Sequence, residues 1–140
     1  MAPAEINPNR NRANLETGKS QTTKRNKGGD IMKLENTKAQ MRKGVLEYCI
    51  LQVLENEPLY VSNIIESLKK SNLIVVEGTL YPMLTRLKNE GYLGYRWEES
   101  LQGPPRKYYE LTETGKFFLD ELKKAWNELV DAVFHINDHN

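Results

Sequence analysis

The chain has 140 residues, of which 39% are apolar and 28% are charged. This length is enough for one compact domain with appendages and too short for two ordinary domains. No stretch approaches the roughly 20 unbroken apolar residues of a membrane-spanning helix, and no apolar block follows the N-terminal basic residues as in a signal peptide. We therefore expect a cytoplasmic protein that does not enter a membrane.

The charges are unevenly distributed along the chain. Residues 1–31 carry a formal charge of +3, residues 32–112 carry +1, and residues 113–140 carry −3. Phosphate binding depends on where the cations lie rather than on their total, so a dimer with its acidic helices turned away can still present a basic face. The net charge of +1 therefore permits DNA binding without requiring it.

Residues 1–31 are rich in Asn, Lys, Arg, Thr and Gly and contain few large apolar side chains. Such a segment cannot bury enough surface to offset its ordering entropy, so a disordered tail is predicted. A second interpretation is that the segment is not native, because Lys27–Gly29 is compatible with a purine-rich run like a bacterial ribosome-binding site and Met32 follows shortly after. The sequence leaves these two interpretations open.

Two helices are predicted between residues 40 and 72. In residues 40–54, apolar residues form two adjacent rows of fourfold spacing on one helical face. The single cysteine, Cys49, lies in these rows and is expected to be a small buried thiol. Pro58 ends this helix, and a second begins near Val61 and closes near Asn72. The apolar positions are Met41, Val45, Cys49 and Val53, then Leu46, Ile50 and Leu54, and finally Val61, Ile64, Ile65 and Leu68.

A third helix is predicted over about residues 78–89. Leu80, Leu84 and Leu87 share one face, and Gly91 supplies the stop. Pro82 is compatible with this helix only if it lies in the first turn.

Two alternating runs around a Gly/Pro-rich connection at residues 98–105 predict a β-hairpin. The order of three helices and a hairpin is that of a winged helix-turn-helix, so the expected fold class is mainly α with a two-stranded β wing, occupying residues 32–111. The alternating positions are Leu93, Tyr95 and Trp97 in the first strand, and Lys107, Tyr109 and Leu111 in the second.

Residues 112–140 are predicted to form a C-terminal dimerisation helix. Thr112 is a suitable N-cap, and Glu113 places an acid in the first turn, where the helix dipole favours it. Beyond them, apolar residues recur at intervals of three and four, a heptad pattern that indicates packing against a partner helix. The predicted dimerisation residues are Leu119, Leu122, Trp126, Leu129, Val133 and Ile136.

The third helix of such a fold enters the major groove of DNA, where side chains opposite the core can reach base edges or phosphates. The wing adds cations near the adjacent phosphates, and its tip at residues 102–104 can approach the minor groove. For each residue the alternative is an ordinary solvated side chain. The predicted DNA-binding residues are Thr79, Tyr81, Thr85, Arg86 and Lys88 in the third helix, and Arg96, Arg106 and Lys107 in the wing.

These segments together resemble the PadR family of transcriptional regulators. The resemblance covers roughly Met41 to Val133 and implies a winged-helix homodimer that represses transcription from pseudo-palindromic operators. Val61 departs from the family, whose members often have Gly after the preceding Tyr. The motifs that carry the resemblance are Gly44–Glu47, Pro58–Tyr60, Gly78–Pro82 with Leu84, Arg86–Leu87, Gly91–Leu93, Gly103–Tyr109 and Leu111–Gly115.

The short C-terminal helix is similar to that of the small PadR-like subgroup, which includes the lactococcal multidrug-binding repressor. In that repressor, symmetry-related tryptophans at the dimer interface sandwich flat aromatic drugs. The analogy implies that Trp126 stacks on a planar aromatic effector. The alternative is that Trp126 merely fills a heptad position.

Other functional classes find less support in the sequence. No Gly-rich phosphate loop, no nucleophile beside a His and no convergent carboxylate pair is present, so neither an enzyme nor a cofactor is predicted. One alternative is a metal-responsive regulator, in which the histidines at helical spacing near the C-terminus bind a metal, although no metal ligand is assigned. Another is a protein-docking module that uses the apolar side of the C-terminal helix. The residues of the possible metal cluster are Asp131, His135, Asp138 and His139.

Overall fold

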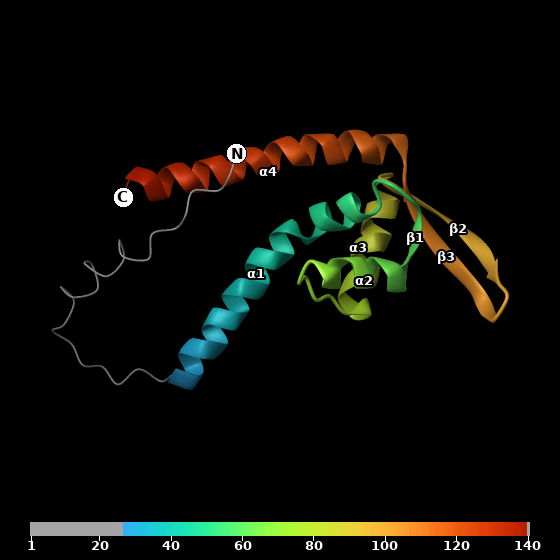
Figure 1. Cartoon of the computed structure of the whole chain (residues 1–140), viewed down its shortest axis with the longest axis horizontal. Coiled ribbons are helices and arrows are strands. Elements are labelled where there is room, and N and C mark those ends of the chain that lie inside the picture. The colour runs from blue at the N-terminus through green and yellow to red at the C-terminus, as the bar shows by residue number, and fades with distance from the viewer. Residues whose placement is uncertain (1–26, 140) are drawn as a thin grey trace. The chain divides into compact units, whose positions relative to one another are not determined.

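The structure, a computed structural model, describes residues 27–139 (Figure 1). Most of the predicted tail, residues 1–26, lies outside this range. The elements in chain order are α1 (Lys27–Val53), β1 (Leu59–Tyr60), α2 (Val61–Lys70), α3 (Glu77–Asn89), β2 (Leu93–Ser100), β3 (Gly103–Leu111) and α4 (Glu113–His139). This mainly helical architecture with a small antiparallel sheet confirms the predicted fold class.

Internal contacts divide the chain into two units, residues 1–39 and residues 40–140. The described part of the first unit is the beginning of α1, and every side chain from Lys27 to Ala39 is exposed. The last residues of the predicted disordered tail, 27–31, are therefore helical, and the prediction is wrong for them. Eight of the ten residues 32–41 are Met, Leu, Ala, Lys, Glu or Gln, which favour helices, and Asp30 is favourable in the first turn.

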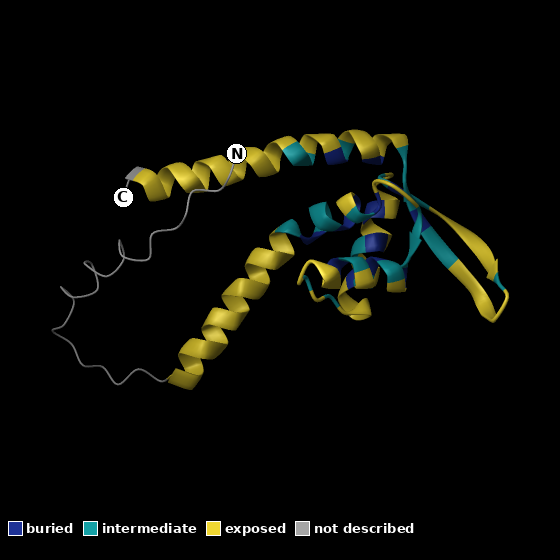
Figure 2. Ribbon diagram, viewed as in Figure 1, coloured by how far each residue is buried: buried dark blue, intermediate teal, exposed yellow. Residues whose placement is uncertain are grey.

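The second unit has one hydrophobic core, formed by the end of α1, by α2 and α3, by the sheet and by the start of α4 (Figure 2). The predicted core faces of α2 and α3 are confirmed. Met41 is 71% exposed, so its assignment to the core is wrong, because α1 packs only from about Val45 onward. The buried residues are Leu46, Ile50, Leu51, Leu54, Val61, Ile64, Leu68, Leu80, Leu84, Leu87, Leu93, Tyr109 and Leu119.

Helix α3 contains an internal proline. Pro82 lies in the second turn instead of the predicted first turn, since the helix begins at Glu77. Proline has no N–H, so it cannot donate the intrahelical hydrogen bond to the carbonyl of Gly78. Gly78 is exposed and has open space around its Cα, so that carbonyl can be solvated.

The hairpin is longer than the sequence indicates, and it has a third strand. Strands β2 and β3 pair antiparallel. The register shifts at a bulge between Glu98 and Ser100, and pairing continues beyond it to Ser100 and Gly103 near the tip. Much of the predicted connection is therefore strand. The short strand β1 pairs with β3 and gives the order β1-β3-β2. Two residues give no alternation, which explains why β1 was not predicted.

The side chain of Thr112 links the turn after α3 to the start of α4. The Thr112 hydroxyl donates to the carbonyl of Gly91 at 2.6 Å and accepts from the amide of Gly115 at 2.9 Å. The second bond confirms Thr112 as the N-cap of α4. Gly91 has a φ of +87° and ends α3, as predicted. We call Gly91, Tyr92, Thr112 and Gly115 the Thr112 junction.

Close backbone approach fixes this junction. A Cβ on Gly115 would collide with the carbonyl oxygen of Tyr92, so a side chain at this position would require the backbone to shift. The amide of Thr112 donates to the same carbonyl at 3.1 Å. The Tyr92 ring stacks on Phe118 of α4, with centroids 4.0 Å apart and planes 3° from parallel. The beginning of α4 is therefore tied directly to the end of α3.

The two halves of α4 differ in burial (Figure 2). Leu119 is 1% exposed in the core, and Leu122 packs against that core. The prediction that Leu119 contacts a partner chain is wrong, because the first turns of the heptad row cover the winged-helix core. From Trp126 onward the described side chains are exposed. We call the exposed apolar side chains Trp126, Leu129, Val130, Val133, Phe134 and Ile136 the α4 stripe.

Across residues 27–139, none of the helices combines the length and apolar character needed to cross a membrane.

Candidate nucleic-acid interface

Helix α3 turns a neutral face to solvent. Gly78, Pro82, Thr85 and Asn89 are spaced by four, three and four residues, and all four are exposed. They lie opposite the buried leucines of α3 and form what we call the outer face. Short side chains on this face let the backbone of the helix approach a surface closely. The shape suits a helix that enters the major groove.

The two cations of α3 lie on either side of the outer face. Arg86 shares one flank with Thr79, seven residues earlier, and Lys88 shares the other with Tyr81. Arg86 Nη2 contacts Glu47 Oε2 of α1 at 2.7 Å. Lys88 Nζ lies 4.7 Å from the centroid of the Tyr95 ring of β2. Both flanks are therefore tied to neighbouring elements, which limits rotation of α3 about its axis.

A groove of about 500 Å³ separates the start of α3 from the wing. We call it the wing groove. Its lining combines aromatic rings with two cations, a composition that suits sugar-phosphate backbone beside base edges. The lining residues are Tyr60, Val61, Ser62, Glu77, Tyr81, Trp97, Pro105, Arg106 and Lys107.

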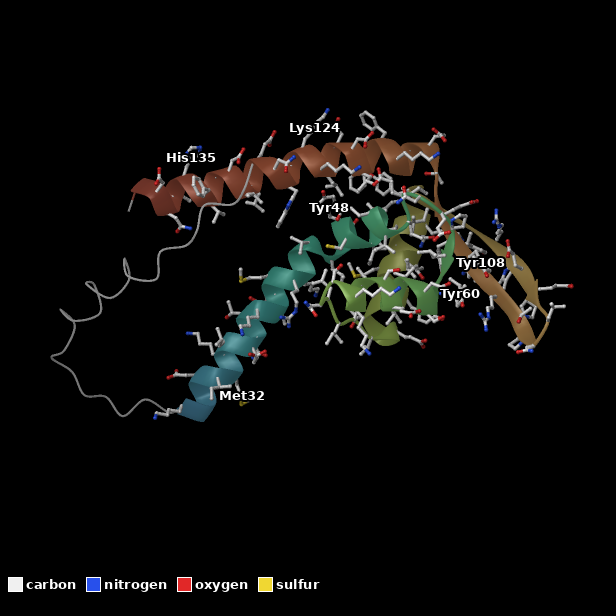
Figure 3. The ribbon with its side chains drawn as sticks, viewed as in Figure 1. Met32, Tyr48, Tyr60, Tyr108, Lys124 and His135 are labelled. Atoms are coloured by element: carbon white, nitrogen blue, oxygen red, sulfur yellow. The ribbon has the colours of Figure 1, made fainter. Side chains whose placement is uncertain are left out.

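Tyrosines support both cations of this groove. The Arg106 guanidinium lies 4.6 Å from the centroid of the Tyr60 ring, and Tyr60 itself meets Tyr108 edge-on at 5.3 Å (Figure 3). Lys107 Nζ lies 3.8 Å from the centroid of the Tyr95 ring. Arg106 and Lys107 are consecutive in β3, so they leave opposite faces of the sheet. One cation therefore lies on each face of the sheet.

Arg96 differs from the other predicted wing cations. Its guanidinium contacts Glu98 at 3.0 Å and Glu110 at 3.7 Å, and both carboxylates lie on the same face of the hairpin. Two neighbouring acids compete with phosphate for this arginine. The structure therefore brings Arg106 and Lys107 to the wing groove with Tyr81 and leaves Arg96 outside it.

A second notable region surrounds Trp126. The Tyr48 ring of α1 faces α4 (Figure 3), and its centroid lies 6.2 Å from that of Trp126, which is 39% exposed. Nearby, Lys123 Nζ contacts Glu55 at 2.6 Å, and this hydrogen bond raises the pKa of Lys123. Partial burial raises the pKa of the Cys49 thiol, so Cys49 is a poor nucleophile at neutral pH.

The possible metal cluster is not assembled within the described part of the chain. No group of three or more His, Cys, Asp or Glu side chains in residues 27–138 converges on a common point. The side chain of His139, one member of the cluster, lies outside the described residues. The metal-responsive alternative therefore gains no support from Asp131, His135 and Asp138.

The sequence matches the profile described as "Transcriptional regulator PadR-like family" over residues 50–121, which is 72 of the 140 residues. The chain belongs to the PadR-like family of transcriptional regulators. The family resemblance seen in the sequence is thereby confirmed, and proteins of this class bind DNA and are generally not enzymes.

Solved structures agree with this membership. A PadR-like transcription factor from Bacteroides fragilis is 62% identical with a TM-score of 0.63, and the match covers 72% of this chain and 98% of that chain. A PadR family regulator from Eggerthella lenta is 31% identical with a TM-score of 0.72, over 80% and 96% of the two chains. One from Bacillus cereus is 36% identical with a TM-score of 0.62, over 69% and 95%.

Several residues of this PadR-like regulator's candidate interface were not predicted. Asn89 lies on the outer face, and its spacing from Thr85 and Pro82 is the signal that identifies it. Tyr60 and Trp97 line the wing groove. In the sequence, Tyr60 belongs to the short connection before the second helix, and Trp97 looks like an ordinary strand residue. Glu47 contacts Arg86 from 39 residues away, and no local pattern could have found that contact.

Proposed function

We propose that this PadR-like regulator is a homodimeric repressor that binds a pseudo-palindromic operator. In this proposal α3 enters the major groove, Arg106 and Lys107 contact phosphates, and the α4 stripe pairs with a second copy. The observation that carries the proposal is the exposed outer face of α3 with a cation on each flank and the cationic wing groove beside it. Thr79, Tyr81, Thr85, Arg86 and Lys88 remain the proposed contacts of α3.

The α4 stripe supports the dimer. Trp126, Leu129 and Val133 are 39%, 54% and 51% exposed, and they recur at the three- and four-residue spacing of a helix-packing seam. A contiguous apolar surface of this kind is characteristic of an interaction site. Two copies related by a twofold axis would place their third helices about one DNA turn apart.

The proposal is tested on the full chain by selecting binding sequences from random duplex DNA and by light scattering at micromolar concentration. We expect a dimer and an inverted repeat whose half-sites lie about one helical turn apart. A dimer that selects no sequence would contradict the function as a sequence-reading repressor. A stable monomer would instead favour the protein-docking alternative for α4.

We also propose that the dimer responds to a planar aromatic effector that stacks on Trp126, as in the lactococcal multidrug-binding subgroup. The partly exposed Trp126 ring, already beside Tyr48, supports this function. A ligand held between symmetry-related indoles would favour one separation of the two α4 helices and so shift the population of DNA-competent dimers.

The effector proposal is tested in the Trp97→Phe variant, in which Trp126 is the remaining tryptophan of the two. Titration of the DNA-free protein with ethidium, a flat cationic dye, should quench its fluorescence at saturating concentration. Trp97→Phe combined with Trp126→Leu should abolish dye binding. Unchanged fluorescence, or dye binding that survives loss of Trp126, would contradict the proposed site.

A further inference from the structure

The ion pair between Glu47 and Arg86 links two elements that are far apart in sequence. The partners are 39 residues apart, and the 2.7 Å contact joins α1 to the flank of α3. Glu47 is the more buried partner, with 25% of its side chain exposed against 52% for Arg86. The carboxylate is therefore held by α1, while much of the guanidinium remains accessible from outside.

Arg86 keeps donors for a second partner. A guanidinium has five N–H donors in a rigid plane, and the contact with Glu47 is made by Nη2. Arg86 also borders a shallow hollow on the outer face of α3 together with Thr85 and Asn89. One edge of the group is thus anchored to α1, and the residue lies at the margin of the surface proposed to read DNA.

Anchoring matters because a base contact needs one defined side-chain geometry. A free arginine on a helix surface samples many rotamers and loses that freedom when it forms two parallel hydrogen bonds to the O6 and N7 atoms of guanine. A carboxylate that restricts the guanidinium beforehand removes part of this entropic cost. If Arg86 left Glu47 for a phosphate, the partly buried carboxylate would lose its partner, which is unfavourable.

We propose that Glu47 is a positioning residue for DNA recognition and that it holds Arg86 where the guanidinium reads a guanine in the major groove. This inference rests on the proposed function, because it assigns a role within the same DNA surface. Glu47 does not touch DNA. It acts through Arg86 by staying paired with it in the complex.

The experiment compares sequence selection and fluorescence anisotropy for the wild-type chain, Arg86→Lys and Glu47→Gln. We expect a guanine preference at one position of each half-site in the wild type and a weaker preference in Arg86→Lys, because lysine lacks the rigid planar fork with which arginine makes two parallel hydrogen bonds. Glu47→Gln should weaken the preference at that same position about tenfold and leave the other positions unchanged.

Glu55→Gln is the matched control. Glu55 follows α1 and pairs with Lys123 at 2.6 Å, so the substitution removes an ion pair of similar length without touching α3. We expect a comparable change in melting temperature and no change in base preference. Glu47→Asp is a second variant that keeps the charge but withdraws the carboxylate by one methylene, and it should weaken the guanine preference as Glu47→Gln does.

Four results would overturn the inference. A uniform loss of affinity at every position would mean that the ion pair only holds α1 against α3. Tighter binding to all sequences, with a steeper salt dependence, would mean that Glu47 withholds Arg86 from phosphates. A wild-type chain that selects no sequence would overturn the proposed function and this inference together, whereas a selected site without a guanine preference would overturn the inference alone.

Discussion

One hydroxyl group, that of Thr112, serves two helices. Its oxygen accepts a hydrogen bond from the first turn of α4, and its O–H group donates a hydrogen bond to the carbonyl of Gly91 just after α3. An N-cap bond of this kind typically stabilises a protein by about 1 kcal/mol. Serine could make both bonds, whereas valine, which has the shape of threonine, could make neither. The residue type at this position is thus determined by two separate backbone groups.

Gly115→Ala is expected to destabilise the protein by about 1 to 3 kcal/mol, since the new methyl group would collide with the Tyr92 carbonyl and force α4 away from the Thr112 junction. The measurement is the free energy of unfolding from urea denaturation.

Gly44→Ala provides the matched control. Gly44 lies within α1, is exposed and has open space where a Cβ would be. Alanine is a better helix former there, so a stabilisation of about 1 kcal/mol is expected. Equal effects of the two substitutions would show that the close approach at Gly115 does not constrain the fold.

The Lys123 and Glu55 pair makes a small contribution to stability that depends on pH. The hydrogen bond raises the pKa of Lys123 in the folded state above its ordinary 10.5. Stability from such a group is fully present below the unfolded pKa and is lost as the pH rises through the folded pKa. The difference in stability between wild type and Glu55→Gln should therefore shrink above pH 10.5. A difference that stays constant through this range would contradict the ion-pair assignment.

At the residue scale, the sequence identified groups that act on their own backbone. Thr112 as a cap and Gly91 as a stop follow from local chemistry. Periodicity, by contrast, says which residues share a face but not what covers that face. Met41 and Leu119 both fit an apolar row, yet Met41 is 71% exposed and Leu119 is 1% exposed. The difference arises because only part of each helix packs against the core, the end of α1 and the beginning of α4.

At the element scale, the apolar residues of α4 belong to two different surfaces, one after the other along the helix. Its first turns complete the core, and its later turns present the α4 stripe. Replacing both Leu129 and Val133 by Asp should convert a dimer to a monomer at micromolar concentration, because four carboxylates would meet in the seam without partners. Light scattering measures the mass, and circular dichroism checks that the helix content is retained.

Phe117→Asp tests whether the effect is specific to the stripe. Phe117 is 67% exposed, and it lies nine residues before Trp126, which places it on the opposite side of α4. This variant should remain dimeric. Dissociation caused equally by Phe117→Asp would mean that the partner covers another face of the helix.

The sequence indicated every helix of the winged domain and the hairpin, because each has a strong period. The element that it missed, β1, is two residues long and exists only because β3 lies beside it. The hairpin was predicted too short, since residues 98–105 contain Gly and Pro but the strand extends through them by means of a bulge. In both cases the strand is defined by its pairing with β3, which no local pattern in the sequence reveals.

At the scale of the whole molecule, the wing cations should control affinity rather than sequence preference. Replacing Arg106 and Lys107 by Ala should weaken binding to all DNA sequences. The slope of log affinity against log salt should fall by roughly 0.9 for each phosphate that the variant no longer neutralises. Anisotropy titrations at several salt concentrations measure this slope.

The exposed pair Lys69 and Lys70, at the end of α2, is the matched control, because its removal changes the net charge by the same amount. The salt slope should stay as in the wild type. Equal effects from both pairs would indicate that total charge, rather than the wing, determines affinity.

The candidate site as a whole was only partly predictable. Arg86, Arg106 and Lys107 were identified by residue type and position. The pairing of Arg86 with Glu47 and the packing of Arg106 on Tyr60 depend on the three-dimensional approach of α1 to α3 and of β1 to β3. Arg96 matches the other wing cations in sequence, and only the register of the hairpin places Glu98 and Glu110 beside it.

The Thr112 junction gives α4 the property of a lever. With 27 residues the helix is roughly 40 Å long, at about 1.5 Å per residue. A swing of about 5° about the junction would move the far end by roughly 3.5 Å, close to the 3.4 Å between successive base pairs of DNA. In the proposed dimer, a displacement of this size at the far end of α4 corresponds to a rotation of only about 5° of the winged domain against its helix, which would change the orientation of the two reading helices relative to their half-sites.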